Sequence, residues 1–283
     1  MAHVLALAPD EKKAKFILKQ NPHLLHFEFK EVIFPLYKCI NMTPAQLVYG
    51  SGDYEMLDQV IKPLFIEQYG EEKGIAELQK EIDVMQNVHK PFDFGPIIKT
   101  ISEESFNQGN DDKNRLLLSP VTLTAIQKFR KDFAANQPKI IDKGVQFRWE
   151  TLVELCEEYR NAAQQWNDDY LKCSLFEDAV IGWVLQYVTQ YAIQNFNQGL
   201  LCLEHEQFER MPLNRQGLDF YKWLCLEAIE LSFERSCPGI IAGNDNTGLG
   251  CAPENIERLQ NFCLAIIKYL QNYAHTNTHV NTP

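Results

Sequence analysis

Three consecutive residues, Glu204, His205 and Glu206, carry side chains that can bind a metal ion. Consecutive residues of a helix point about 100° apart, so these three side chains cannot converge on one ion without help from elsewhere. His23 and His26 flank a pair of leucines, and the sequence places them at the edge of a loop. Neither group of residues lies in a helical metal-binding motif such as HExxH or ExxH. The sequence therefore predicts no metal site.

A glycine-rich stretch, residues 239–250, precedes an expected helix that begins at Pro253. Backbone N–H groups of such a loop can hold an anion, but the order GxxxxGK[ST] is absent and no predicted strand precedes the loop. The run Asn244-Asp245-Asn246 is typical of a calcium loop, yet Asn255 stands where such a loop needs its distal glutamate. A turn between two helices explains the glycines best, and no cofactor is predicted.

The remaining candidates for catalytic residues are the cysteines. The eight cysteines have no CxxC spacing and lie at positions 39, 156, 173, 202, 225, 237, 251 and 263. Most fall on apolar faces of expected helices, where a free thiol packs as a small hydrophobic group, so we expect reduced thiols. No GxSxG motif and no protease context around a cysteine is present. The alternative hypothesis is an enzyme of unrecognised type, with a site of Cys, His and Asp between the N-terminal and the helical region.

The charge balance argues against two classes of partner. Lys and Arg total 27 against 38 Asp and Glu, a net charge of −11, which disfavours phosphate backbones and anionic lipid. We therefore expect no nucleic acid binding. Membrane insertion is not expected either, because the longest apolar stretch, residues 179–188, is far short of a membrane span. Residues 1–9 lack a basic segment and residues 10–13 are charged, so no signal peptide is predicted and a cytoplasmic location is expected.

The N-terminal elements can be placed from turn and cap signals. A short helix is expected over residues 10–20, closed by the Asn21-Pro22 step, followed by an extended finger over residues 27–36. Thr43 and Pro44 are a typical N-cap and first helical residue, and the helix they start should stop at residues 50–52. A second helix should begin at Asp53, with an apolar face formed by Met56, Leu57, Val60 and Ile61.

This order of finger, Thr-Pro helix, glycine and second helix resembles an ankyrin repeat. The residues that match the ankyrin pattern are Thr43, Pro44, Leu47, Gly52, Glu55 and Met56. Ala45 and Gln46 replace the usual Leu-His, and Val48 and Tyr49 replace small alanines that let helices pack closely. Because one repeat cannot bury its own faces, the segment ending near Tyr69 should be unable to fold alone and should be covered by downstream helices.

The resemblance extends to ankyrin-like bacterial effectors of the Legionella type, which are injected into host cells. It is carried by AKFILKQNPHLL and GDYEML near the start, and by KGVQFRWETLVELCEEY and LFEDAVIGWVLQYV later in the chain. The resemblance implies engagement of a host protein and, for an effector, secretion into the host cytosol by a specialised system. It implies no agreed catalytic site.

The rest of the chain reads as helical from Phe92 onward. Ser119 should cap a helix, a small hairpin is expected over residues 139–149, and a helix should follow through residues 152–166. Ser174 and Glu177 form a predicted capping box at the start of the next helix. Later amphipathic helices are expected over residues 218–228 and from Pro253 onward.

These observations combine into one prediction of fold and function. The fold is mainly α, a degenerate ankyrin-like helix pair with a β-finger packed on a larger α-helical domain. Residues 1–90 form the ankyrin-like region, residues 91–271 the α-helical domain and residues 272–283 a frayed polar tail. The leading hypothesis is a protein-protein interaction module. Ankyrin surfaces bind through finger tips and the inner helix, which places Lys38, Asn41 and Tyr49 near the expected contact with a protein partner.

Overall fold

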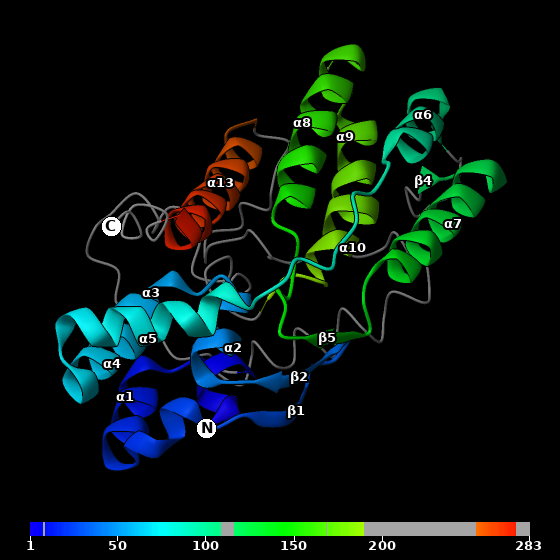
Figure 1. Ribbon diagram of the computed structural model, residues 1–283. Coiled ribbons are helices and arrows are strands. Elements are labelled where there is room, and N and C mark those ends of the chain that lie inside the picture. The colour runs from blue at the N-terminus through cyan, green and yellow to red at the C-terminus, as the bar shows by residue number, and fades with distance from the viewer. Residues whose placement is uncertain (8, 109–115, 168, 190–252, 276–283) are drawn as a thin grey trace.

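The chain is mainly helical with a small three-stranded sheet, which confirms the predicted fold class (Figure 1). The computed structural model describes residues 1–7, 9–108, 116–167, 169–189 and 253–275. Within those residues, no helix is both long enough and apolar enough to cross a membrane. The predictions for residues 204–206, 218–228, 239–250 and the cysteines at 202, 225, 237 and 251 lie outside the described residues.

The first helices follow the expected caps. They are η1 (His3–Leu7), α1 (Glu11–Gln20) and η2 (Pro22–His26). The carboxylate of Asp10 accepts a hydrogen bond from the backbone N–H of Lys13, and α1 ends at the residue before Asn21-Pro22. The expected helix over residues 10–20 is therefore confirmed.

A hairpin, β1 (Phe29–Ile33) and β2 (Lys38–Met42), forms the predicted finger. The third strand, β5 (Ile140–Asp142), pairs in parallel with β2, and the sheet order is β1-β2-β5. The separate hairpin expected over residues 139–149 is wrong, because its first half joins the N-terminal hairpin and no second strand follows it there. Val32, Cys39 and Ile141 are neighbours across the sheet and all three are buried.

The Thr-Pro helix is α2 (Pro44–Gly50), and its capping box is complete. Thr43 accepts from the N–H of Gln46, and the Gln46 side chain accepts from the N–H of Thr43. Gly52 turns the chain with φ of 74°, a conformation that favours glycine. The second helix starts at Asp53 as predicted, and the Asp53 carboxylate caps it by accepting from the N–H of Met56. That helix continues as α3 (Tyr54–Met56), η3 (Leu57–Ile61) and α4 (Lys62–Tyr69), and α5 (Glu71–Asp83) follows.

The helices of the remaining chain stand side by side beyond the sheet (Figure 1). They are α6 (Gly95–Glu103), α7 (Pro120–Asn136), α8 (Glu150–Gln165), α9 (Tyr170–Phe176), η4 (Glu177–Ile181), α10 (Gly182–Leu185) and α13 (Pro253–His275), with the short strands β3 (Asn107–Gln108) and β4 (Leu116–Leu117) between α6 and α7. Ser119 caps α7 as predicted, and α13 begins at Pro253. The last helix includes residues 272–275 of the predicted polar tail.

The predicted capping box of Ser174 and Glu177 is wrong. The helix begins at Tyr170, where the Asp169 carboxylate accepts hydrogen bonds from the N–H groups of Leu171 and Lys172. Glu177 instead accepts a hydrogen bond of 2.6 Å from the Tyr159 hydroxyl on α8. The Glu177 carboxylate, which the local sequence pattern assigned to a helix cap, therefore bonds to a distant helix instead.

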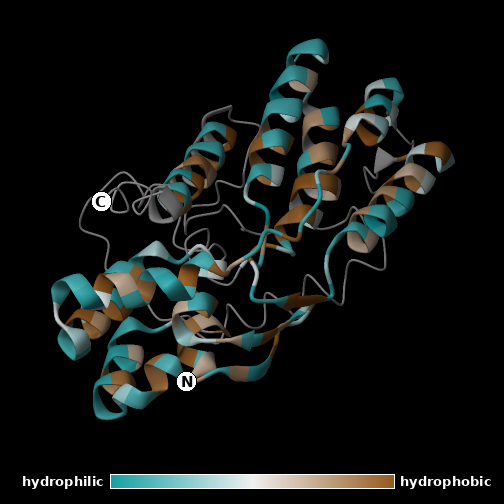
Figure 2. Cartoon of the chain, in the orientation of Figure 1, coloured by the Kyte–Doolittle hydropathy of each residue, from teal (hydrophilic) through white to brown (hydrophobic). Residues whose placement is uncertain are grey.

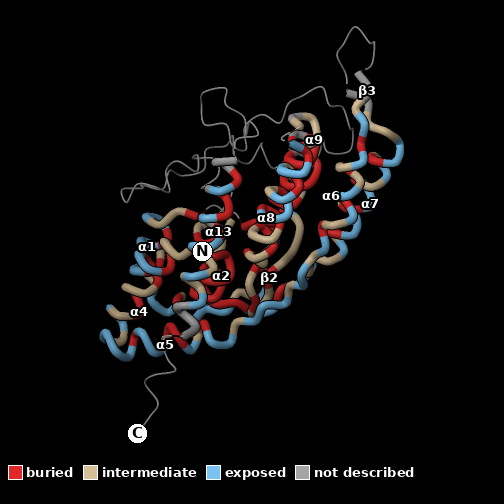
Figure 3. Tube along the Cα trace, turned by 90° about the horizontal axis from the view of Figure 1, so that it is seen from above, coloured by how far each residue is buried: buried red, intermediate tan, exposed pale blue. Residues whose placement is uncertain are grey.

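The described residues form two hydrophobic cores, and in Figure 3 the buried positions, in red, lie along helices such as α2, α8 and α9. Figure 2 shows mixed apolar and polar positions along α5 and α8, as expected of helices with one buried side. The first core draws on residues 5–82 and Ile141, and the second draws on residues 94–188 and α13. The apolar face that includes Met56 and Ile61 lies in the first core, which also contains Ile141 and is packed against Tyr269 and Leu270 of α13. That the segment ending near Tyr69 cannot fold alone stays a prediction. The predicted boundary after residue 90 stays a prediction.

Hydrogen bonds of Gln146 connect the first core to the segment that leads into the second core. Gln146 is 2% exposed; its Nε2 donates to the Leu47 carbonyl at 2.9 Å, and its backbone N–H donates to the Gly50 carbonyl at 2.7 Å. The Tyr37 hydroxyl donates to its Oε1 at 3.1 Å. These bonds satisfy polar groups that burial would otherwise penalise, and they fix the segment before α8 against the C-terminal end of α2.

Candidate functional site

One face of the sheet is open and carries aligned apolar side chains. Ile33 of β1 is paired with Lys38 of β2, and Lys38 is paired with Ile140 of β5, so the three residues form one row across the strands. Residues that pair directly across strands point to the same face. Ile33 is 68% exposed and Ile140 is 53% exposed, in contrast to the buried row on the opposite face. The row therefore presents two isoleucines with a lysine between them.

The next row on the same face is more polar. It contains Glu31, Ile40 and Asp142. A carboxylate oxygen of Glu31 lies 2.7 Å from Nζ of Lys38, and Nδ2 of Asn41 donates to Oδ1 of Asp142 at 3.3 Å. Asn41 has φ of 56°, a backbone conformation that asparagine tolerates better than most residues. Lys38 and Asn41, two of the predicted contact residues, thus both lie on β2. Their side chains bond to the neighbouring strands β1 and β5.

The third predicted contact residue, Tyr49, lies elsewhere. Its side chain is buried, and its hydroxyl donates to the carbonyl of Leu270 on α13 at 3.3 Å. Burial, with the nearby charge of Asp83, raises the pKa of Tyr49. The structure does not bring Tyr49 together with Lys38 and Asn41, because the Tyr49 ring packs into the first core.

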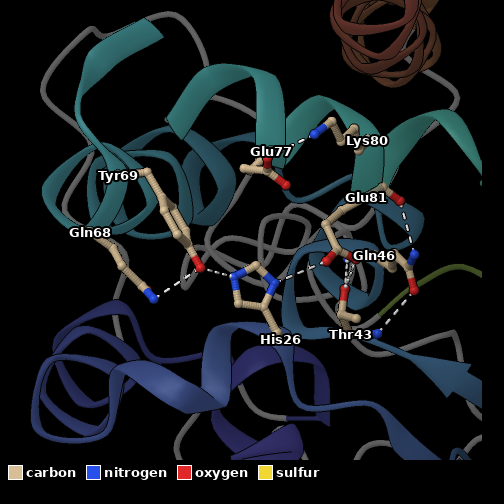
Figure 4. Close-up of polar contacts among 8 residues, drawn as sticks. All are labelled: His26, Thr43, Gln46, Gln68, Tyr69, Glu77, Lys80 and Glu81. Carbon is tan, nitrogen blue, oxygen red and sulfur yellow. Dashed lines mark hydrogen bonds and ion pairs between the residues drawn. The ribbon is translucent and has the colours of Figure 1, made fainter. Parts of the chain in front are cut away.

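A second arrangement of polar side chains surrounds His26, at the end of η2 (Figure 4). Nε2 of His26 lies 2.6 Å from the hydroxyl oxygen of Tyr69, and Nδ1 lies 3.2 Å from Oε1 of Glu81. Nε2 of Gln68 donates to the same Tyr69 oxygen at 3.0 Å. We call Tyr69, His26 and Glu81 the His26 triad. Its members come from three elements, η2, α4 and α5.

The carboxylate of the triad is itself held in place. Oε2 of Glu81 accepts from the Thr43 hydroxyl at 2.9 Å, and the Glu81 backbone carbonyl accepts from Nε2 of Gln46 at 2.9 Å. Both donors belong to the capping box of α2, so the start of that helix fixes Glu81 of α5. On the same helix, the hydrogen bond from Lys80 holds the pKa of Glu77 below its usual value, and the charges of Lys80 and Lys73 act in the same direction.

Sequence reasoning missed Tyr69 and Glu81 and considered His26 only as a metal ligand. The hydrogen-bonded pairs are separated by 43 and 55 positions, so no local spacing marks them. Only the packing of η2 against α4 and α5 brings the three side chains together. No sequence signal identifies the triad without that packing.

Burial makes three of the described cysteines weak nucleophiles. Cys39, Cys156, Cys173 and Cys263 are buried. Burial raises the pKa of Cys39 and of Cys156 to about 12, and it also raises the pKa of Cys263. A thiol with so high a pKa carries almost no thiolate near neutral pH. Among the described residues, no three side chains of His, Cys, Asp or Glu are grouped so as to hold a metal ion.

His89 also makes a contact between segments that are distant in the sequence. Its Nε2 lies 2.9 Å from the Val145 carbonyl, in the stretch where the segment after α5 runs beside the residues that follow β5. Burial lowers the pKa of His89, although hydrogen bonds to Val145 and Gln137 act in the opposite direction. Burial therefore favours the neutral form of the imidazole, which packs between these segments.

Comparison of the chain with protein-family models, with curated proteins and with solved structures finds no match.

Proposed function

We propose that this chain is a protein-protein interaction module and that the open face of the β1-β2-β5 sheet contacts the partner. The observation that carries the proposal is the row of Ile33, Lys38 and Ile140, in which both isoleucines are more than half exposed. Burying an isoleucine side chain contributes roughly 1.5–3 kcal/mol, so two aligned isoleucines favour association with an apolar surface. Apolar residues rimmed by polar ones are typical of protein contact sites.

The surroundings of the row support this reading. Glu31, Asn41 and Asp142 supply a polar rim on the same sheet, and interfaces commonly combine an apolar centre with such a rim. The hairpin that carries Ile33 and Lys38 is the finger that resembles the binding finger of an ankyrin repeat. The resemblance to effectors extends the proposal to a partner from a eukaryotic host cell, and that extension rests on the sequence alone.

Site-specific photo-crosslinking tests the proposal. The photoreactive residue p-benzoylphenylalanine is placed at Lys38, in the middle of the row, and in a second variant at Val121. Val121 is a matched control because it is 72% exposed and lies on α7, away from the sheet. The full-length variants are expressed in eukaryotic cells, irradiated and resolved by mass.

We expect one discrete adduct from position 38 and none of that mass from position 121. An adduct with a protein of different mass supports the proposal and allows the partner to be identified. An adduct with a second copy of the chain, equal adducts from both positions, or no adduct from position 38 contradicts it.

A further inference from the structure

The direction of each proton in the His26 triad follows from its partners (Figure 4). The Glu81 carboxylate only accepts, so Nδ1 of His26 must carry the proton that is shared over 3.2 Å. In the neutral imidazole, Nε2 is then an acceptor. The amide nitrogen of Gln68 donates to the Tyr69 oxygen, so the hydroxyl proton is directed toward Nε2 of His26, at 2.6 Å. The phenol therefore donates its proton to a base.

This base is oriented by further bonds. Glu81 fixes the tautomer of His26, and the Thr43 hydroxyl in turn fixes Glu81 at 2.9 Å. A hydroxyl, a base within hydrogen-bond reach and a third group that orients the base are the parts required for an activated nucleophile. Tyr69 supplies the hydroxyl in this arrangement, where serine or cysteine is more common.

The hydroxyl can be reached from solvent, and its surroundings suit a phosphoryl group. The His26 side chain is 36% exposed, and its hydrogen bonds lie at the protein surface. Nζ of Lys73 lies 5.5 Å from the centre of the Tyr69 ring, and the Gln68 amide donates directly to the oxygen. An amide donor at the oxygen and a cation over the ring stabilise the negative charge that develops when the proton leaves. They are also suitable partners for phosphoryl oxygens.

We propose that Tyr69 is a nucleophilic site for phosphoryl donors, with His26 as its general base and Glu81 as the positioning residue. In the step, Oη of Tyr69 attacks phosphorus, and its proton passes to Nε2 of His26. The bond from phosphorus to the leaving oxygen of a phosphate ester or anhydride breaks, and His26 returns the proton to that oxygen. The products are a tyrosyl phosphoester and the released alcohol or phosphate. This activity is separate from the sheet-face contact, because the two share no residue.

A fluorophosphonate probe tests the nucleophile in the full chain, since attack by Tyr69 displaces fluoride from phosphorus. The rate of labelling is measured for each tyrosine by peptide mass spectrometry. Tyr37 is the matched internal control, because its hydroxyl donates to the Gln146 side-chain oxygen, which is no base. We expect Tyr69 to be labelled at least about tenfold faster than Tyr37, a conservative value against the ~10²–10⁴-fold that a general base contributes.

Two variants separate the base from a structural role. His26→Ala should reduce labelling of Tyr69 to the rate of Tyr37, and added imidazole should restore it, because the vacated position is open to solvent. Glu81→Gln keeps a side-chain oxygen that can accept from Thr43. It should lower the labelling rate of Tyr69 without changing that of Tyr37. Labelling of Tyr69 no faster than Tyr37 would overturn the proposal. So would unchanged labelling in folded His26→Ala or in Glu81→Gln.

Discussion

Gly52 lies where three distant segments meet, and replacing it with alanine should be among the most damaging small changes in the chain. A Cβ at this position would lie 2.9 Å from Nε1 of Trp149, before α8, and 3.0 Å from Cγ2 of Ile266, on α13. Both neighbours are almost fully buried, so moving either one would disturb the packing around it. The φ of 74° adds a conformational cost for any residue with a side chain.

The two costs can be added. A left-handed backbone costs an alanine roughly 1–2 kcal/mol, and overpacking of a filled core costs roughly 1–3 kcal/mol. Gly52→Ala should therefore lower the free energy of unfolding by about 2–5 kcal/mol, and the melting temperature by at least ~4 °C. Thermal unfolding followed by circular dichroism measures the effect.

Two other glycines are controls for the same substitution. At Gly70, with φ of 84°, an added Cβ meets nothing within 4 Å, so Gly70→Ala measures backbone strain without a clash. At Gly182, the first residue of α10, a Cβ would make an ordinary contact of 3.5 Å, and alanine should be neutral or stabilise by up to ~1 kcal/mol. A Gly52→Ala protein that melts at or above the temperature of the parent protein would refute the convergence of Trp149 and Ile266 on this turn.

Three further predictions concern buried groups. Cys39 and Cys156 should not react with a thiol reagent in the folded protein at neutral pH and should react after unfolding, because burial raises each pKa to about 12. Gln146→Leu should lower the free energy of unfolding by about 1–3 kcal/mol in urea titrations, since two side-chain hydrogen bonds are lost; an unchanged midpoint would contradict this. Because burial lowers the pKa of His89, the unfolded chain binds its proton first as the pH falls. Stability should therefore decrease below the unfolded pKa of ~6.5, and His89→Gln should reduce that decrease.

Elements defined by local caps were predictable. Asp10, Thr43 and Ser119 each accept from an N–H three residues ahead, so their signals lie within a single turn. The same logic failed at Ser174, because Asp169 starts the helix earlier and Glu177 bonds to Tyr159, eighteen positions before it. A local pattern cannot show that a distant hydroxyl competes for the same carboxylate.

Long-range features were not predictable from one sequence. The strand at Ile140–Asp142 has the expected extended character, but its partner β2 lies about a hundred positions away, and only the fold specifies a parallel pairing. Tyr49 illustrates the same limit, since its hydroxyl donates to the Leu270 carbonyl on α13, 221 positions away. The His26 triad depends on the packing of η2, α4 and α5, which no spacing encodes.

The most direct test of the proposed contact surface is to remove its apolar side chains and measure the adduct formed from position 38. The double variant Ile33→Ser with Ile140→Ser keeps the buried row of the sheet intact, and Val121→Ser is the matched control. We predict that the double variant loses the adduct, that the control retains it, and that both variants keep the helical signal in circular dichroism. Undiminished crosslinking in the folded double variant would contradict the assignment of the open sheet face as the binding surface.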